Sequence, residues 1–125
     1  MNALVVDDSR ATRAVLRKHL EAIGFTVAEA GHGGEALQQL DGTVAFDLAL
    51  VDWNMPEMDG LELVRAIRAD RRQAALPVMM ITAESDPANM VRALMAGADE
   101  YAMKPLDRQS LTGKLALMGV IAEAP

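Results

Sequence analysis

Short apolar segments alternate along the chain with longer segments in which apolar residues recur at helical spacing. The apolar runs are continuous, as is typical of strands buried on both faces of a parallel sheet. They predict strands over residues 3–6, 25–29, 46–51, 78–81 and 101–103. The remaining segments predict helices over about residues 9–23, 35–40, 61–70, 86–96 and 107–121. This β-α order, repeated five times, favours an α/β fold: a three-layer, doubly wound parallel sheet with helices on both faces.

Residues that begin or end helices mark the boundaries of these segments. Ser9 is suited to cap the first helix and Gly24 to end it. The run Gly31-His32-Gly33-Gly34 is expected to form a loop before the second helix. Gly113 and Gly119 are expected inside the last helix, where each costs roughly 1 kcal/mol relative to Ala.

Polar residues stand just past the ends of four predicted strands. They are Asp7 and Asp8 after the first strand, Asp52 after the third, Thr82 after the fourth and Lys104 after the fifth. Ligands of doubly wound sheets bind beyond the carboxyl ends of the strands, where the winding direction switches. The pattern therefore predicts one site that contains three carboxylates, a hydroxyl and an amine.

The residue types in this group favour phosphoryl transfer that depends on a divalent cation. Clustered carboxylates repel one another unless a cation is present, and Mg²⁺ prefers oxygen ligands. A carboxylate is also a nucleophile toward phosphorus, so Asp52 is the candidate acceptor. Lys104 offers a point charge and Thr82 a directed hydrogen bond to the phosphoryl oxygens.

Composition and charge narrow the class of protein further. The 125 residues suit one domain, and the 51% hydrophobic but only 3% aromatic content indicates an aliphatic core with nine Met. A net charge of -6 argues against direct binding of nucleic acid. The absence of Cys excludes disulfides and thiolate chemistry, and two separated His make zinc or copper a poor choice. Without a signal peptide or an apolar run of ~20 residues, we expect a cytoplasmic protein with no membrane contact.

Other residues have simpler interpretations. Residues 31–36 satisfy G-x-G-x-x-A, but this run follows the second strand rather than the first, so a loop that opens a helix is favoured over a dinucleotide site. His19 is expected to pack against the core and His32 to lie exposed in a loop. Trp53 fits either core packing or a role in lining the site, and Tyr101 either the sheet end or a mobile reporter. Met90 or Met95 is a candidate for facing a partner.

Taken together, these motifs resemble the receiver domain of two-component response regulators, and most closely its single-domain, CheY-like type. The resemblance runs from about residue 2 to about 120 and rests on Val5-Val6-Asp7-Asp8-Ser9, Asp52-Trp53-Asn54-Met55-Pro56, Asp59-Gly60, Ile81-Thr82-Ala83, Gly97-Ala98 and Lys104-Pro105. It implies a (βα)₅, flavodoxin-like fold with strand order 2-1-3-4-5, formed by a single receiver domain over residues 1–125. It also implies a cis peptide between Lys104 and Pro105.

The resemblance assigns a metal role to four residues. Asp8 and Asp52 are expected to bind Mg²⁺ directly, with Mn²⁺ as an alternative ion. The backbone carbonyl of Asn54 is implied as the third protein ligand, and Asp7 is implied to act through water.

It assigns the remaining site residues to the phosphoryl group. Asp52 is the implied phosphoacceptor, Lys104 pairs with its carboxylate or phosphoryl group, and Thr82 moves toward the phosphoryl oxygen. Backbone N–H groups of Trp53 and Ala83 contact the same group. Finally, two positions that flank the hydrolytic water are implied to tune the phosphate lifetime: Asn54 and Glu84.

As a function, the resemblance implies a phosphorylatable switch and no enzyme beyond its own phosphorylation and dephosphorylation. A sensor histidine kinase donates the phosphoryl group, Thr82 is drawn in, and Tyr101 turns inward. The face made by the fourth helix, fifth strand and fifth helix then changes and controls a downstream protein, in chemotaxis or elsewhere. A monomer is expected, with dimerisation on activation left open.

Two alternatives stay open at this point. The chain ends at Pro125, which favours a stand-alone switch, but a receiver domain cut from a longer regulator with a DNA-binding or enzymatic output also fits. A metal-dependent phosphatase on a similar sheet is the other alternative. That class uses a second acid two residues after the nucleophile, where this chain has Asn54.

Overall fold

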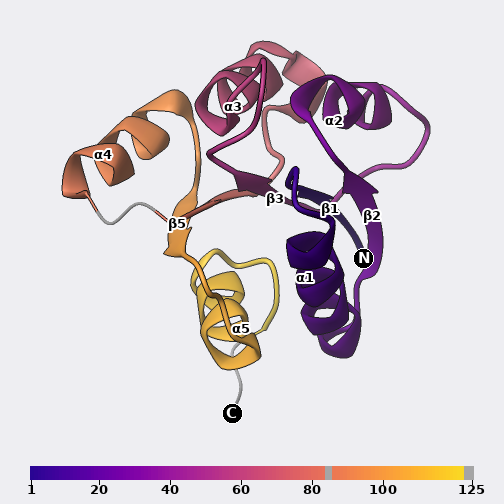
Figure 1. The fold of residues 1–125 in the computed structure, drawn as a ribbon. Helices are drawn as coiled ribbons and strands as arrows, with labels where there is room; N and C mark the ends of the chain where they lie inside the picture. The colour runs from indigo at the N-terminus through magenta and orange to yellow at the C-terminus, as the bar shows by residue number, and fades with distance from the viewer. Residues whose placement is uncertain (84–85, 123–125) are drawn as a thin grey trace.

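The structure is a computed structural model that describes residues 1–83 and 86–122, and within these ranges five strands alternate with five α-helices (Figure 1). The strands are β1 (Asn2–Val6), β2 (Thr26–Ala30), β3 (Leu48–Asp52), β4 (Val78–Thr82) and β5 (Glu100–Met103). The α-helices are α1 (Arg10–Ile23), α2 (Gly33–Leu40), α3 (Gly60–Ala69), α4 (Pro87–Ala96) and α5 (Arg108–Leu117). A 3₁₀ turn, η1 (Arg71–Gln73), follows α3.

The strands form one parallel sheet in the order β2-β1-β3-β4-β5, which confirms the predicted topology. The register pairs Val6 with Val51 and Asp52 with Ile81, so β1, β3 and β4 reach the same edge of the sheet. The chain reverses its winding direction between β1 and β3, and this is the place where ligands of such folds bind.

Helices cover both faces of the sheet, with α1 and α5 on one face and α2, α3 and α4 on the other (Figure 1). Alternate side chains of each strand enter the two layers. In β1, Leu4 and Val6 pack toward α2 and α3, while Ala3 and Val5 pack toward α1 and α5. Because both layers are apolar, the strands read as continuous hydrophobic runs rather than alternating ones.

The beginning of α2 differs from the prediction. The helix begins at Gly33 rather than at residue 35, so Gly33 and Gly34 belong to its first turn instead of a loop. His32 explains the difference, because its Nδ1 accepts a hydrogen bond from the Glu35 backbone N–H (3.2 Å) and caps the helix. His32 is exposed, as expected, but it is a capping residue.

Two further boundaries differ. β3 begins at Leu48 rather than Phe46 and includes Asp52. The last helix ends at Leu117 rather than near Ile121, because Gly119 takes a φ of 77° in the left-handed region, where glycine terminates helices. Gly119 therefore lies outside the helix, whereas Gly113 lies inside it as predicted.

Helix α4 is the least buried of the three helices on its face of the sheet. Of its ten residues, Ala93 is the one that is buried. Its larger apolar side chains Met90, Val91, Leu94 and Met95 are 44–83% exposed. The part of the chain that the structure describes contains no helix with the length and apolar character needed to cross a membrane.

Candidate functional site

The predicted polar residues meet at the carboxyl edge of the sheet. Asp7 and Asp8 follow β1, Asp52 is the last residue of β3, Thr82 is the last residue of β4 and Lys104 follows β5. Asp7, Asp52 and Thr82 are almost fully buried, with exposed fractions of 1%, 4% and 0%. Asp8 is exposed and gives the cluster its opening to solvent.

Lys104 joins the two buried acids. Its Nζ lies 2.9 Å from Asp7 Oδ2 and 3.0 Å from Asp52 Oδ1. The backbone N–H of Lys104 donates to the Thr82 carbonyl (2.8 Å), which ties the strand-end residues of β4 and β5 together. The peptide between Lys104 and Pro105 is cis, as the resemblance implied.

The three carboxylates are close enough to share a cation. One oxygen each from Asp7, Asp8 and Asp52 lies within 4.8 Å of the others. All of these donors are hard oxygen ligands, and exposed Asp8 leaves one side open to water, which suits the partly hydrated coordination of Mg²⁺. The residues present therefore fit a magnesium ion.

The site shifts the proton affinities of two groups. Burial raises the pKa of Asp52 above its usual value, the charges of Asp7 and Asp8 add to this, and the hydrogen bond from Lys104 only partly offsets it. Burial acts to lower the pKa of Lys104, but hydrogen bonds to Asp7 and Asp52 outweigh it, so the pKa of Lys104 is raised. These surroundings therefore favour the charged form of Lys104 and disfavour the ionised form of Asp52.

Arg13 holds the β1–α1 turn and was missed by the sequence reasoning. Its Nη1 donates to the Asp7 carbonyl (2.6 Å) and its Nε to Glu29 Oε1 (3.0 Å). Ser9 supports the same turn, because its N–H donates to Asp7 Oδ1 (2.8 Å) while its Oγ caps α1. Burial acts to raise the pKa of Glu29, but hydrogen bonds from Arg17 and Arg13 lower it on balance, so Glu29 stays charged.

The loop after Asp52 folds back onto its own backbone. The Gly60 N–H donates to the Trp53 carbonyl (2.8 Å). A Cβ at Gly60 would collide with the Asp52 carbonyl oxygen and lie 2.8 Å from Trp53 Cα. Asp59-Gly60 is among the motifs that carry the family resemblance, but the sequence gave no sign that this close approach requires the absence of a side chain.

Trp53 and Tyr101 pack against each other beside the site. Trp53 is 8% exposed and Tyr101 6% exposed, and their ring centroids lie 6.4 Å apart at 84°. Tyr101 therefore lies inward in this structure. The backbone N–H of Trp53 donates to the Ile81 carbonyl (3.1 Å). A contact from the same backbone N–H to a phosphoryl oxygen would therefore compete with this hydrogen bond.

The structure describes two of the three remaining predicted residues. Asn54 and Ala83 follow β3 and β4 and are exposed. Glu84 lies outside the described residues. Their assignments to the metal, the phosphoryl group and its hydrolysis remain predictions.

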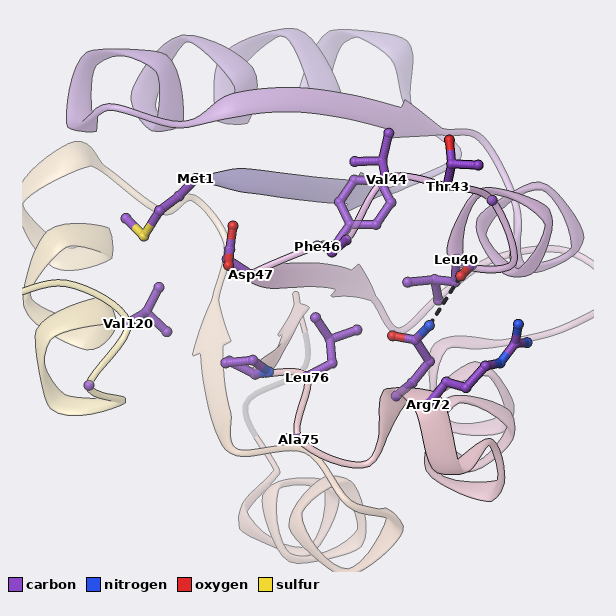
Figure 2. A pocket seen from close by; sticks show the side chains of 15 residues that line it. Met1, Leu40, Thr43, Val44, Phe46, Asp47, Arg72, Ala75, Leu76 and Val120 are labelled. Carbon is purple, nitrogen blue, oxygen red and sulfur yellow. Dashed lines mark hydrogen bonds between the residues drawn. The ribbon is translucent and has the colours of Figure 1, made fainter.

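A large open cavity of about 560 Å³ lies at the opposite, amino-terminal edge of the sheet (Figure 2). Leu40, Phe46, Leu76 and Arg72 are among its lining residues, and Gln73 Nε2 donates to the Leu40 carbonyl across it (3.1 Å). None of the acids at the carboxyl edge lines this cavity. Its size does not make this cavity a better candidate for the functional site, because it lacks the converging charged groups found at the carboxyl edge.

Comparisons with known proteins agree with this geometry. A sequence model of the family described as the response regulator receiver domain matches residues 3–116. Chemotaxis protein CheY1 of Helicobacter pylori strain J99 is 44% identical over 116 residues, which cover 92% of this chain and 94% of that protein. The chemotaxis protein CheY homolog of Campylobacter jejuni is 41% identical over 116 residues, covering 92% of this chain and 89% of that protein. Among solved structures, Vibrio cholerae CheY4 superposes with a TM-score of 0.88 at 32% identity, covering 94% of this chain and 97% of that one.

Proposed function

The chain belongs to the family of response regulator receiver domains, and from this premise we propose that it is a chemotaxis switch in which Asp52 accepts a phosphoryl group from a sensor histidine kinase. The observation that carries the proposal is the bridge from Lys104 Nζ to Asp7 and Asp52 inside the cluster of three carboxylates. A receiver is a signalling domain rather than an enzyme with a separate substrate. The family assignment thus replaces the alternative of a metal-dependent phosphatase.

In the proposed reaction, a carboxylate oxygen of Asp52 attacks the phosphorus of a phosphohistidine. The new P–O bond forms as the P–N bond breaks, and the leaving imidazole takes up a proton. The transferred phosphoryl group adds negative charge at Asp52, so the positive charge of Lys104 beside it favours the product. Lys104 then turns its charge from the carboxylate toward the phosphoryl oxygens, and the Thr82 hydroxyl donates to one of them.

The metal site that we propose uses Asp8 and Asp52 as direct ligands, the Asn54 carbonyl as a third, and Asp7 through water. Mg²⁺, when bound, supplies positive charge that balances the carboxylates and the incoming phosphoryl oxygens. Asp7 and Asp52 are almost fully buried, while exposed Asp8 leaves a path for the phosphodonor and for the metal-bound water. Asn54 and Glu84 are proposed to set the phosphate lifetime.

The output is proposed to be a change in the face formed by α4, β5 and α5. Phosphorylation adds charge and acceptors at Asp52 and draws in Thr82. Inward packing of Tyr101 against Trp53 is the arrangement that this change would favour. The downstream target is proposed to be a protein that binds this face. We propose that phosphoryl transfer and target binding take place in the cytoplasm, as expected from the sequence.

The curated relatives support a receiver of the CheY type. The chain and the Helicobacter pylori and Campylobacter jejuni proteins match over nearly the whole length of each. Both relatives are named chemotaxis proteins, which supports chemotaxis as the pathway of this chain.

The test uses Trp53, the one tryptophan of the chain, as a reporter. We expect beryllofluoride or a small phosphodonor to change Trp53 fluorescence when Mg²⁺ is present and to have no effect in Asp52→Asn. A wild-type protein that gives no response would remove the phosphoacceptor role. Lys104→Ala should still accept the phosphoryl group but fail to transmit it, and full output from that variant would contradict the role given to Lys104.

A further inference from the structure

Helix α4 is anchored by side-chain contacts just past its C-terminal end. Past its C-terminal end, Arg68 Nε donates to the Gly97 carbonyl (2.8 Å), and Arg68 Nη2 bonds Asp99 Oδ2 (2.9 Å). Along the helix itself, Ala93 alone among its ten described residues is buried. A helix with so little buried apolar surface belongs to the less stable part of a fold.

Arg92, the sixth of the ten residues of α4, supplies a further contact for this helix. Its guanidinium carbon lies 5.5 Å from the centre of the Trp53 ring, within the range of a cation–π interaction. Arg92 Nη1 also donates to Asn89 Oδ1 one turn earlier in α4 (3.3 Å), which holds the guanidinium against its own helix. The indole ring is therefore contacted by Arg92 of α4 and by Tyr101 of β5.

Trp53 is in turn fixed to the phosphoacceptor. It follows Asp52 directly in the chain, its N–H donates to the Ile81 carbonyl (3.1 Å), and its carbonyl accepts from the Gly60 N–H (2.8 Å). Because the backbone is held on both sides, a shift of the Asp52 peptide is carried to the indole ring rather than absorbed by the loop. The structure thus contains a continuous path from Asp52 through Trp53 and Arg92 to α4.

We propose that Arg92 is a positioning residue that couples occupancy of Asp52 to α4 through the face of Trp53. This inference rests on the proposed function and adds a second route to the one that runs through Thr82 and Tyr101. A cation–π contact depends on the placement of the cation over the ring, so a shift of the indole weakens or tightens it. Since α4 is part of the proposed output face, Arg92 sets how strongly that face responds.

The experiment compares wild type with Arg92→Gln, which keeps a side chain able to bond Asn89 but removes the cation. Hydrogen exchange of the α4 amides is measured with and without beryllofluoride and Mg²⁺, and Trp53 fluorescence is followed in the same samples. In wild type, we expect beryllofluoride to change α4 exchange. In Arg92→Gln, basal exchange in α4 should rise roughly two- to thirtyfold, and the response of α4 should be lost although Trp53 fluorescence still saturates with beryllofluoride.

Two further variants separate coupling from a general structural effect. Arg92→Lys keeps a cation for the indole and should restore much of the α4 response. Arg65→Gln removes the same charge from an exposed position on α3 and should behave as wild type. The coupling proposal is overturned if α4 in Arg92→Gln responds as in wild type, or if exchange rises equally throughout the protein. The proposed function itself is lost, instead, if wild-type Trp53 gives no response to beryllofluoride.

Discussion

At residue 60, the absence of a side chain determines how the loop after the phosphoacceptor can close. A Cβ there would collide with the Asp52 carbonyl oxygen, which is backbone and has little freedom to move. We therefore expect Gly60→Ala to lower the free energy of unfolding by about 2–4 kcal/mol and to weaken the response to beryllofluoride. Urea denaturation measures the first effect and Trp53 fluorescence the second.

Gly113 provides the matched control for this prediction. It lies inside α5, and a Cβ there would meet nothing within 4 Å. Gly113→Ala should therefore stabilise the protein by about 0.5–1 kcal/mol, since alanine is the better helix former. Equal effects of the two substitutions would show that the close approach at Gly60 does not matter.

Asp52 itself makes a pH-dependent contribution to stability. Because burial and neighbouring acids raise its pKa in the folded protein, the contribution of Asp52 favours folding at low pH and is lost as pH rises through the folded pKa. In the absence of metal, Asp52→Asn should be more stable than wild type at pH 7, by an amount on the order of 1 kcal/mol. The difference should shrink as the pH falls through the folded pKa of Asp52 and wild type takes up a proton. Urea denaturation across this pH range is the measurement, and a gap that widened toward acid pH would contradict it.

The sequence identified the acids more readily than the residues that hold them in place. Asp7, Asp52 and Thr82 each end an apolar run, and parallel strands bring such ends together. No comparable sequence pattern indicates Arg13 or Arg92. Arg13 bonds the backbone carbonyl of Asp7, and Arg92 lies over the ring of Trp53, which follows a different element. Contacts of this kind depend on how a helix packs against the sheet. The local sequence pattern does not determine that packing.

At the scale of the elements, α3 and α4 lie on the same face of the sheet but differ in how they are held. In α3, Leu61, Leu63, Val64 and Ile67 are buried, whereas the large apolar residues of α4 are exposed. We expect Ile67→Ala to cost about 2–5 kcal/mol of stability, and Met95→Ala, at 83% exposure, less than about 0.5 kcal/mol. Thermal unfolding of both variants tests this, and a large loss at Met95 would mean that α4 is covered in solution.

The order of helices and strands could be predicted from the hydrophobic pattern of the sequence, but the residues at which several of them begin or end could not. The apolar runs are short and unalternated because both faces of the sheet are covered, and that pattern indicated the strands. The start of α2 was misplaced because His32 caps it, a residue outside the usual group of Ser, Thr, Asp and Asn. The end of α5 was misplaced because Gly119, counted as a helix residue, takes a left-handed φ instead.

At the scale of the whole molecule, the fold gathers charge at one edge of a sheet whose central strands are largely apolar. The β-α alternation predicted the parallel sheet, but the strand order 2-1-3-4-5 came from the resemblance to a family and not from the residues. That order places β1 beside β3 and so brings Asp7 next to Asp52. The packing of two apolar layers thus fixes the acids in place, and their mutual repulsion opposes folding.

A cation that binds this edge should therefore stabilise the entire domain. Binding to the folded state alone adds RT ln(1 + [L]/Kd), which is about 1.4 kcal/mol when Mg²⁺ is at ten times its dissociation constant. We expect Mg²⁺ to raise the melting temperature of wild type by several degrees and EDTA to reverse the change. Asp8→Asn should lose this shift, because Asp8 is an exposed proposed ligand whose replacement leaves the core intact. Glu62→Gln, which removes an exposed acid of α3, should retain it. If Mg²⁺ stabilised Asp8→Asn as much as wild type, the cation would be binding elsewhere on the acidic surface, and the assignment of the three acids as its site would be wrong.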